Sequence, residues 1–388
     1  MTNRFARTAL ACLCLVCHAC RPPSTAESDG TGRTISPQWQ VNFGASEVVL
    51  AVAATTPGTV IVGGTGKLVG LDPATGREKW NLAVAFGVPY AGLVVVSETL
   101  AALVTGDGYL IFDPRDGRVL RSWLEPRPRR YPSGTLPQTL SDGRIVYASR
   151  ARDLLALDPR TGRLDTLVTL PGDSLRHSYV AALAVYKDTI YAPVGTDARR
   201  GAAFRNTVPY RYAVATRVLD SLRPDPSDSA SLTRWLLPFD NLLVSATDYS
   251  EPSWLAFDRT SGERRWKVGA APASPGPKSQ VAIVGDTMFA GGNDGQAYVI
   301  HIPTGRLIRT MPIPSGLVDG VVACGRDVFF NVIGSTTGYS RDGTQRIRVT
   351  NLAEGHEAFL GFFTVGNGIA VIGDAGGLWL AFPCAPPA

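Results

Sequence analysis

The chain has 388 residues, with 38 Lys and Arg against 33 Asp and Glu, so its formal net charge is +5. This small excess does not predict nucleic-acid binding, and a hydrophobic fraction of 45% with only 18% charged residues excludes a wholly disordered chain. The 41 Gly and 28 Pro leave little room for long amphipathic helices, and they favour an all-β fold.

The N-terminus has the layout of a secretory signal. The first 20 residues read MTNRFARTALACLCLVCHAC, with a basic start and an apolar run from Ala9 to Val16. This run is too short to cross a bilayer as a stable helix, but it suits the apolar part of a signal peptide. We therefore predict a signal peptide over residues 1–19.

Cys20 is the candidate site of lipid attachment. It follows Ala19 and precedes the polar stretch RPPSTAESDGTGRTIS, and this layout resembles a bacterial lipoprotein signal, in which the mature chain begins at a lipid-modified Cys. Secretory cleavage after Ala19 without a lipid is the alternative. With the lipid, residues 20–36 are expected to be a flexible linker that keeps a folded body near a membrane. The position after Cys20 holds Arg21 and not Asp. The resemblance then implies that the protein is anchored at the periplasmic side of the outer membrane.

One hairpin motif recurs along the rest of the chain. It is clearest in LVGLDPATGREKW (68–80), where an apolar strand runs into a turn with Asp72 and Gly76, and a second strand reaches Trp80. Asp accepts backbone hydrogen bonds in such turns, and Gly takes the positive φ that returns the chain to the sheet. The turn glycine recurs at Gly117, Gly162, Gly262, Gly305 and Gly343, at spacings of 41, 45, 100, 43 and 38 residues from Gly76 onward.

The repeat predicts a β-propeller. Two further strands precede each hairpin, and four short strands in about 40 residues are typical of one propeller blade. The 100-residue spacing predicts a degenerate unit at 178–222, and a last unit at 357–382 has only three strands. We expect the segment QWQVNF (38–43) to supply the missing outer strand, so that residues 37–388 form a closed ring of eight four-stranded antiparallel blades. Seven blades is the alternative if 178–222 is not a blade.

The repeat resembles that of pyrroloquinoline-quinone-type propellers over nearly the whole mature chain. Trp80 and Trp266 match the Trp of that repeat, which in the family packs between neighbouring blades, whereas Arg121, Thr166 and Arg309 stand at the same position in other units. The family includes quinone-dependent alcohol and sugar dehydrogenases. It also includes the BamB-type lipoproteins of outer-membrane assembly, which are non-enzymatic scaffolds and are closer to this chain in length, architecture and anchor.

The sequence does not predict a catalytic site, a metal site or a cofactor. Many of the dehydrogenases place two adjacent cysteines over the quinone, whereas the cysteines of the mature chain are Cys20, Cys324 and Cys384. The three histidines after the signal peptide also lack zinc-ligand spacing. We therefore expect a protein-binding propeller that is not an enzyme. A quinone-dependent dehydrogenase, or a propeller that binds a small ligand or redox cofactor, is the alternative.

Cys324 and Cys384 are candidates for a disulfide bond. Cys324 is predicted to end the innermost strand of the seventh unit, and Cys384 follows the third strand of the eighth. These strand ends lie on the same face of neighbouring blades, and an oxidising compartment would preserve the bond. Two unpaired thiols are the alternative, and a Cα–Cα distance well beyond about 7 Å would exclude the bond.

Two Arg-rich segments are candidates for binding a partner. EPRPRRYPSG (125–134) follows the second unit, and TDARRGAAFRNTVPY (196–210) is predicted as an insertion in the fourth, on the same face of the ring. Arg side chains suit carboxylate recognition, so we expect a monomer that binds an acidic envelope protein or an anionic head group. Solvated loops are the alternative. The candidate residues are Arg127, Arg129, Arg130, Arg199, Arg200 and Arg205.

Overall fold

The structure is a computed structural model in which the chain divides into two units, Met1–Gly32 and Arg33–Ala388. All of the described strands belong to the second unit. The residues that the structure describes are 32–43, 52–64, 66–84, 92–105, 108–124, 136–149, 152–172, 178–180, 182–196, 205–222, 236–247, 253–269, 281–292, 294–314, 318–332, 335–349, 362–373 and 377–384.

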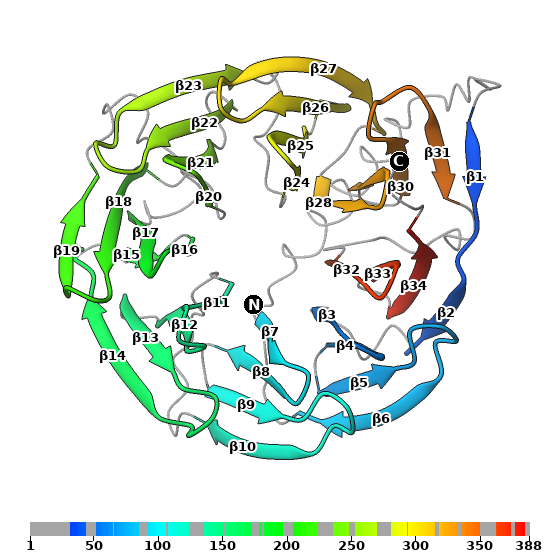
Figure 1. The fold of residues 1–388 in the computed structure, drawn as a ribbon, viewed down its shortest axis with the longest axis horizontal. Coiled ribbons are helices and arrows are strands. Elements are labelled where there is room, and N and C mark those ends of the chain that lie inside the picture. The colour runs from blue at the N-terminus through cyan, green and yellow to red at the C-terminus, as the bar shows by residue number, and fades with distance from the viewer. Residues whose placement is uncertain are drawn as a thin grey trace, which may run out of the picture. The chain divides into compact units, whose positions relative to one another are not determined.

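The described part of the second unit forms eight β-sheets around a ring, in chain order (Figure 1). We number these sheets as blades 1 to 8, each listed from its inner to its outer strand. Blades 1 and 2 consist of β3 (Val52–Thr56), β4 (Thr59–Gly64), β5 (Lys67–Leu71) and β6 (Glu78–Ala83), and of β7 (Gly92–Ser97), β8 (Leu100–Thr105), β9 (Gly108–Phe112) and β10 (Val119–Leu124). Blade 3 consists of β11 (Gln138–Thr139), β12 (Ile145–Ala148), β13 (Asp153–Leu157) and β14 (Leu164–Thr169).

In blade 4 the inner position is shared by two short strands that both pair with the next one. Blade 4 consists of β15 (Ser178–Val180) and β16 (Ala184–Tyr186), then β17 (Thr189–Thr196), β18 (Arg205–Ala213) and β19 (Val218–Ser221). Blade 5 consists of β20 (Leu237–Phe239), β21 (Leu242–Thr247), β22 (Ser253–Asp258) and β23 (Arg264–Gly269). Blade 6 consists of β24 (Ala282–Val284), β25 (Thr287–Gly291), β26 (Gln296–His301) and β27 (Arg306–Pro312).

The last two blades each contain a strand from the beginning of the chain. Blade 7 consists of β28 (Val318–Cys324), β29 (Asp327–Val332), β30 (Ser335–Ser340) and β31 (Arg346–Val349), with β1 (Arg33–Ile35) outside β31. Blade 8 consists of β32 (Phe362–Gly366), β33 (Ile369–Gly373), β34 (Leu378–Pro383) and β2 (Trp39–Asn42). Strands within each blade pair antiparallel, except that β1 and β31 pair in parallel.

The core of the propeller lies between the blades. Strands such as β9, β22 and β33 are buried along their whole length, because both faces of their blade are covered by its neighbours. Each of the eight interfaces between adjacent blades contains its own cluster of buried apolar side chains. The ring is therefore held together by side-by-side packing of apolar sheets, and each blade depends on two neighbours.

The closure of the ring confirms the predicted fold. β2 pairs antiparallel with β34, with Trp39 opposite Ala381 and Asn42 opposite Leu378, so the N-terminal strand completes the last blade as expected. The degenerate unit at 178–222 is blade 4, which makes the count eight and not seven. Figure 1 shows β1 and β2, in dark blue, outside β31 and β34.

Two predicted boundaries differ from the structure. Residues 33–35 fall within the predicted linker 20–36 but form β1, because the β-branched Thr34 and Ile35 pair with Arg348 and Val349 of β31. The predicted insertion at 196–210 is also too long, because residues from Arg205 onward belong to β18.

The described residues contain no helix with the length and apolar character that a membrane span requires.

Candidate functional site

The repeated turn holds its Asp in a fixed set of hydrogen bonds. The Asp72 carboxylate accepts hydrogen bonds from the backbone amides of Ala74 and Thr75, at 3.0 and 2.9 Å, and from the Thr75 hydroxyl at 2.9 Å. These donors, the Thr75 hydroxyl first, lower the pKa of Asp72. Gly76 follows at a φ of +69° and donates its amide to the Asp72 carbonyl. The turn acids therefore shape the hairpin.

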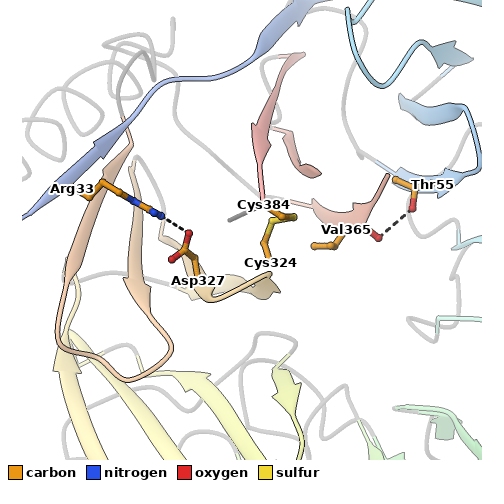
Figure 2. The surroundings of a disulfide bond; sticks show 6 residues. All are labelled: Arg33, Thr55, Cys324, Asp327, Val365 and Cys384. Carbon is orange, nitrogen blue, oxygen red and sulfur yellow. Dashed lines mark hydrogen bonds and ion pairs between the residues drawn. A yellow bond between two sulfur atoms is a disulfide. The ribbon is translucent and has the colours of Figure 1, made fainter. Parts of the chain in front are cut away.

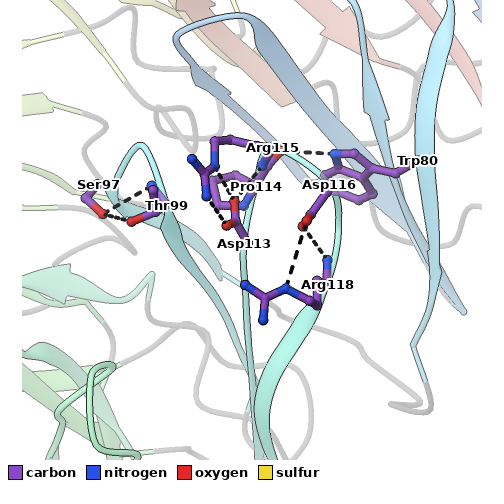
Figure 3. Close-up of polar contacts among 8 residues, drawn as sticks. All are labelled: Trp80, Ser97, Thr99, Asp113, Pro114, Arg115, Asp116 and Arg118. Atoms are coloured by element: carbon purple, nitrogen blue, oxygen red, sulfur yellow. Dashed lines mark hydrogen bonds and ion pairs between the residues drawn. The ribbon is translucent and has the colours of Figure 1, made fainter.

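The repeat tryptophans join each blade to the next one. The Trp80 indole nitrogen donates to the carbonyl of Pro114 in the blade 2 turn at 3.0 Å (Figure 3). Its ring covers Gly117, where an added Cβ would lie 2.7 Å from the indole. Trp266 donates in the same way to the carbonyl of Ile302 at 2.7 Å and covers Gly305. Both tryptophans are buried, and their position between blades agrees with the structural role that the resemblance implied.

Trp39 is a third member of this set that the sequence reasoning missed. Its indole nitrogen donates to the carbonyl of Pro73 at 2.9 Å, and its ring covers Gly76. Trp39 belongs to β2, which is the outer strand of blade 8, so it links the last blade to the first. The signal was present in the closing segment QWQVNF, but no turn glycine precedes it to mark the repeat.

Arginine takes the place of Trp in other blades. Arg121 in β10 donates to the carbonyl of Arg160 in the blade 3 turn, with its Nε at 3.3 Å and its Nη2 at 3.2 Å, and its side chain lies against Gly162. Arg309 in β27 likewise donates to the carbonyl of Asp342 in the blade 7 turn. A guanidinium can replace an indole here because both offer an N–H to the same acceptor.

The interface between blades 4 and 5 has the fewest buried apolar side chains of the eight that the structure describes. There the guanidinium of Arg259 lies 3.8 Å from the centre of the Tyr186 ring, and its Nη1 donates to the Tyr191 hydroxyl at 3.4 Å. Arg211 of β18 also donates to the carbonyl of Thr260 at 2.9 Å. Cation–π contact and hydrogen bonds therefore supplement a small apolar cluster.

The interface between blades 7 and 8, which we call the seam, is closed differently. The outer strand of blade 8 comes from the N-terminus, so no turn connects it to β34 as in the other blades. Instead, a disulfide joins Cys324 to Cys384 across the seam, with 4.9 Å between the two Cα atoms (Figure 2). Arg33 of β1 forms an ion pair with the buried Asp327 beside it.

Blades 8 and 1 also contact each other through side chains at their inner strands. The Thr55 hydroxyl donates to the carbonyl of Val365 at 3.2 Å (Figure 2). The Asn367 side-chain amide donates to the carbonyl of Thr56 at 2.7 Å. Blade 8 is therefore fixed to blade 7 by a covalent bond and to blade 1 by Trp39 and these hydrogen bonds.

The outer strand of blade 2 has an unusual surface. All six residues of β10 are exposed, and four of them are large and apolar. Their exposed fractions are 43% for Val119, 38% for Leu120, 38% for Trp123 and 50% for Leu124. We call these four residues the β10 edge. It is the most apolar outer strand surface among the described blades.

The predicted lipidation site, Cys20, and most of the predicted partner-binding residues lie outside the described residues. These partner-binding residues are Arg127, Arg129, Arg130, Arg199 and Arg200. Of Arg205, the structure describes only the backbone, in β18. His301 is the last residue of β26, just before the turn, with its Nδ1 2.8 Å from the Thr304 hydroxyl. Among the described residues, His, Cys, Asp and Glu side chains form no group of three or more that could hold a metal ion.

The fold and contacts define the class of protein: a closed eight-bladed propeller with a repeated Asp–Gly turn and an inter-blade Trp. Residues 27–196 match a family model described as "Outer membrane protein assembly factor BamB". This match covers less than half of the chain, so it shows that residues 27–196 are similar to the repeats of that family. No curated protein matches the chain.

Several solved structures share the fold. The computationally designed protein Ika8 superposes with a TM-score of 0.67 at 15% identity, covering 91% of this chain and 100% of that one. BamB from Moraxella catarrhalis superposes with a TM-score of 0.51 at 15% identity, covering 86% of this chain and 81% of that one. Sqt1 from Saccharomyces cerevisiae has a TM-score of 0.64 at 9% identity, covering 92% and 100%. At these identities the likeness shows the propeller architecture.

Proposed function

We propose that this protein is a non-enzymatic scaffold of the bacterial envelope that binds an envelope protein during outer-membrane protein assembly. The observation that carries the proposal is the BamB-like repeat, matched over residues 27–196 and built into a closed ring. A rigid ring of this kind presents its loops and outer strands as fixed binding surfaces.

The contacts of the repeat residues support a binding role. The turn acids shape their own hairpins, and the repeat tryptophans join neighbouring blades. Cys324 and Cys384 are bonded to each other across the seam, so they do not form the adjacent pair that many quinone-dependent dehydrogenases place over their cofactor. The disulfide also supports an oxidising compartment, such as the periplasm.

The proposed anchor is a lipid on Cys20 that holds the propeller at the periplasmic side of the outer membrane. Because β1 begins at Arg33, the proposed linker is limited to residues 21–32. Metabolic labelling with a fatty acid tests the anchor: the wild type should be labelled and found with membranes, whereas Cys20→Ser should be unlabelled and released. A labelled Cys20→Ser variant would contradict the assignment.

The proposed partner surface comprises the Arg-rich segments with Arg127, Arg129, Arg130, Arg199, Arg200 and Arg205. Arg129→Glu with Arg130→Glu should abolish capture of an acidic envelope partner at low salt. Arg346→Glu with Arg348→Glu is the matched control, because both residues are exposed on β31 and carry the same charge. Equal capture by wild type and both double variants, with the retained proteins identified by mass spectrometry, would contradict this surface.

A dehydrogenase test addresses the alternative function. The purified protein, reconstituted with pyrroloquinoline quinone and calcium, should not oxidise alcohols or sugars. Turnover that depends on both additions would overturn the scaffold assignment.

A further inference from the structure

The β10 edge differs from the outer strands of other blades at equivalent positions. The second and third residues after the turn glycine are Glu78 and Lys79 in blade 1 and Arg264 and Arg265 in blade 5. In blade 2 these positions hold Val119 and Leu120. The structural equivalence is close, because the register shifts at the same point in each blade and Leu120 is the extra bulge residue, as Lys79 and Arg265 are.

Blade 2 differs from blades 1 and 5 both at the inter-blade position and at the two positions before it. Where the inter-blade residue is Trp, as in blades 1 and 5, the preceding exposed residues are charged. Where it is Arg121, the charge faces the neighbouring blade and the apolar side chains face outward. Proteins usually protect an outer strand with charged residues, because its free backbone edge can pair with another chain. In β10 the one charged side chain is Arg121, and its guanidinium is bound to the Arg160 carbonyl of blade 3.

Blade 6 has an apolar pair at the same two positions as blade 2, but its apolar surface does not extend further along the strand. Leu307 and Ile308 occupy the same positions in β27, followed by Arg309. That strand ends in Pro312, which has no amide hydrogen to donate to an added strand. β10 instead continues with Trp123 and Leu124, both exposed, so its apolar surface extends to the end of the strand.

The molecule itself shows that the outer edge of a blade accepts a further strand. β1 pairs in parallel with β31 and forms a fifth strand on blade 7. β10 pairs only with β9, so no described strand lies on the corresponding edge of blade 2. An extended segment is therefore the kind of occupant that this edge fits.

The charged groups of the turn before β10 and of β10 itself are engaged within the protein, so they call for no opposite charge on the occupant. Figure 3 shows two neighbouring ion pairs in the turn that leads into the strand: Arg115 Nη2 lies 2.7 Å from Asp113 Oδ2, and Arg118 Nε lies 3.9 Å from Asp116 Oδ2. Each Arg is thus matched by an acid of the same turn. In the strand that follows, the Arg121 guanidinium donates to the Arg160 carbonyl of blade 3, and the four apolar side chains and the outer backbone groups are what the strand offers to a partner.

We propose that the β10 edge is a docking site for an extended, uncharged and apolar segment of a partner protein, which adds to blade 2 as a fifth strand. Backbone hydrogen bonds to β10 hold the segment, and Val119, Leu120, Trp123 and Leu124 pack against its apolar side chains. The site goes beyond the proposed Arg surface, and its affinity is insensitive to salt, whereas binding through the Arg-rich segments falls as salt rises.

The test uses the purified full-length protein and a fluorescent peptide of alternating Val and Thr, as long as β10. We expect binding by fluorescence anisotropy at both low and high salt, with slower amide hydrogen exchange at residues 119–124. A peptide with the same side chains but N-methylated backbone should not bind, because it cannot donate the hydrogen bonds of a strand. Absence of binding, or binding without protection of residues 119–124, would overturn the proposal.

The test variants introduce residues that another blade of this chain has at the same positions. Val119→Glu with Leu120→Lys installs the pair of blade 1 in blade 2, so the fold should be retained, and peptide binding should weaken about tenfold. Leu307→Glu with Ile308→Lys makes the same change on β27 and should leave binding unchanged. Equal binding by both variants would overturn the site. A dimer that forms in wild type and is lost with Val119→Glu and Leu120→Lys would instead assign the edge to a second copy of the chain and would also overturn it.

Discussion

Because Gly117 has no side chain, the Trp80 ring of blade 1 can pack directly against the turn of blade 2. Its φ is +72°, and an added Cβ would lie 2.7 Å from the Trp80 ring. Gly58 has the same φ of +72°, but no heavy atom lies within 4 Å of its Cβ position. Gly58→Ala should therefore show only backbone strain, about 1 kcal/mol, whereas Gly117→Ala should lose roughly 1–3 kcal/mol more. Urea denaturation of both variants measures the difference.

The Trp80→Ala background is the control for that prediction. With the ring removed, Gly117→Ala should destabilise the protein by no more than Gly58→Ala does, so the two substitutions should not be additive. A loss that is the same in both backgrounds would show that the contact with Trp80 is not its cause.

The lowered pKa of Asp258 leads us to expect a loss of stability in acid. The amides of Ser261 and Thr260 and the guanidinium of Arg265 lower its pKa from 3.8 to about 2. A carboxyl whose pKa is lower in the folded state stabilises the protein above its unfolded pKa, and this stabilisation is lost as the pH falls through the folded value. The free energy of unfolding should therefore decrease between about pH 4 and pH 2. Asp258→Asn should flatten this part of the profile; a profile parallel to wild type would contradict the assignment.

At the scale of elements, the seam depends on a covalent bond where other interfaces use a turn. The disulfide links residues 60 apart in sequence, and a loop of that length is expected to contribute about 4 kcal/mol through the entropy of the unfolded chain. Cys324→Ser with Cys384→Ser should lower the urea midpoint accordingly. Adding a reductant should lower the midpoint of wild type but leave that of the double variant unchanged. A midpoint of wild type that does not respond to complete reduction would contradict the prediction.

The outer strands show which features of an element were readable in advance. The hairpins could be predicted because Asp, Gly and the following strand recur together, and each has a chemical reason to be in the turn. β1 could not, since three residues in a polar stretch become a strand only by pairing with β31, more than 300 positions away. The exposure of Val119 and Leu120 could not be predicted either, because an apolar strand is expected to be buried unless it is known to be the outer strand of its blade.

At the scale of the whole molecule, the N-terminal strands should decide whether the ring closes. Removal of residues 1–43 takes away β1 and β2, leaves the edge of β34 unpaired and removes Trp39 from Gly76. We expect this protein to unfold at a lower temperature and to aggregate through the exposed edge. Removal of residues 1–31 should leave both properties unchanged, because both strands remain. Size-exclusion chromatography and thermal unfolding distinguish the two, and identical behaviour would contradict the role of β1 and β2.

The number of blades and the mode of closure could be predicted from the spacing of the turns, because each blade repeats the same hairpin. The inter-blade contacts could be predicted where Trp80 and Trp266 match the repeat. They could not be predicted where Arg121 and Arg309 serve instead, since an exposed-looking Arg gives no sign of the carbonyl it binds. The proposed Arg surface stays a prediction, because those side chains lie outside the described residues.

The pairing of β2 with β34 has a consequence for how the protein is made. A ribosome makes the chain from its N-terminus onward, so Trp39 emerges long before its partner Ala381. Until the final strand arrives, the first blade has no neighbour on one side and the early segment has no sheet to join. Each blade can form its own hairpins as it emerges, but the ring can close only after β34 has emerged. A nascent propeller of this kind therefore exposes an apolar blade face and an open strand edge throughout its delivery, which is the period when it most needs a chaperone.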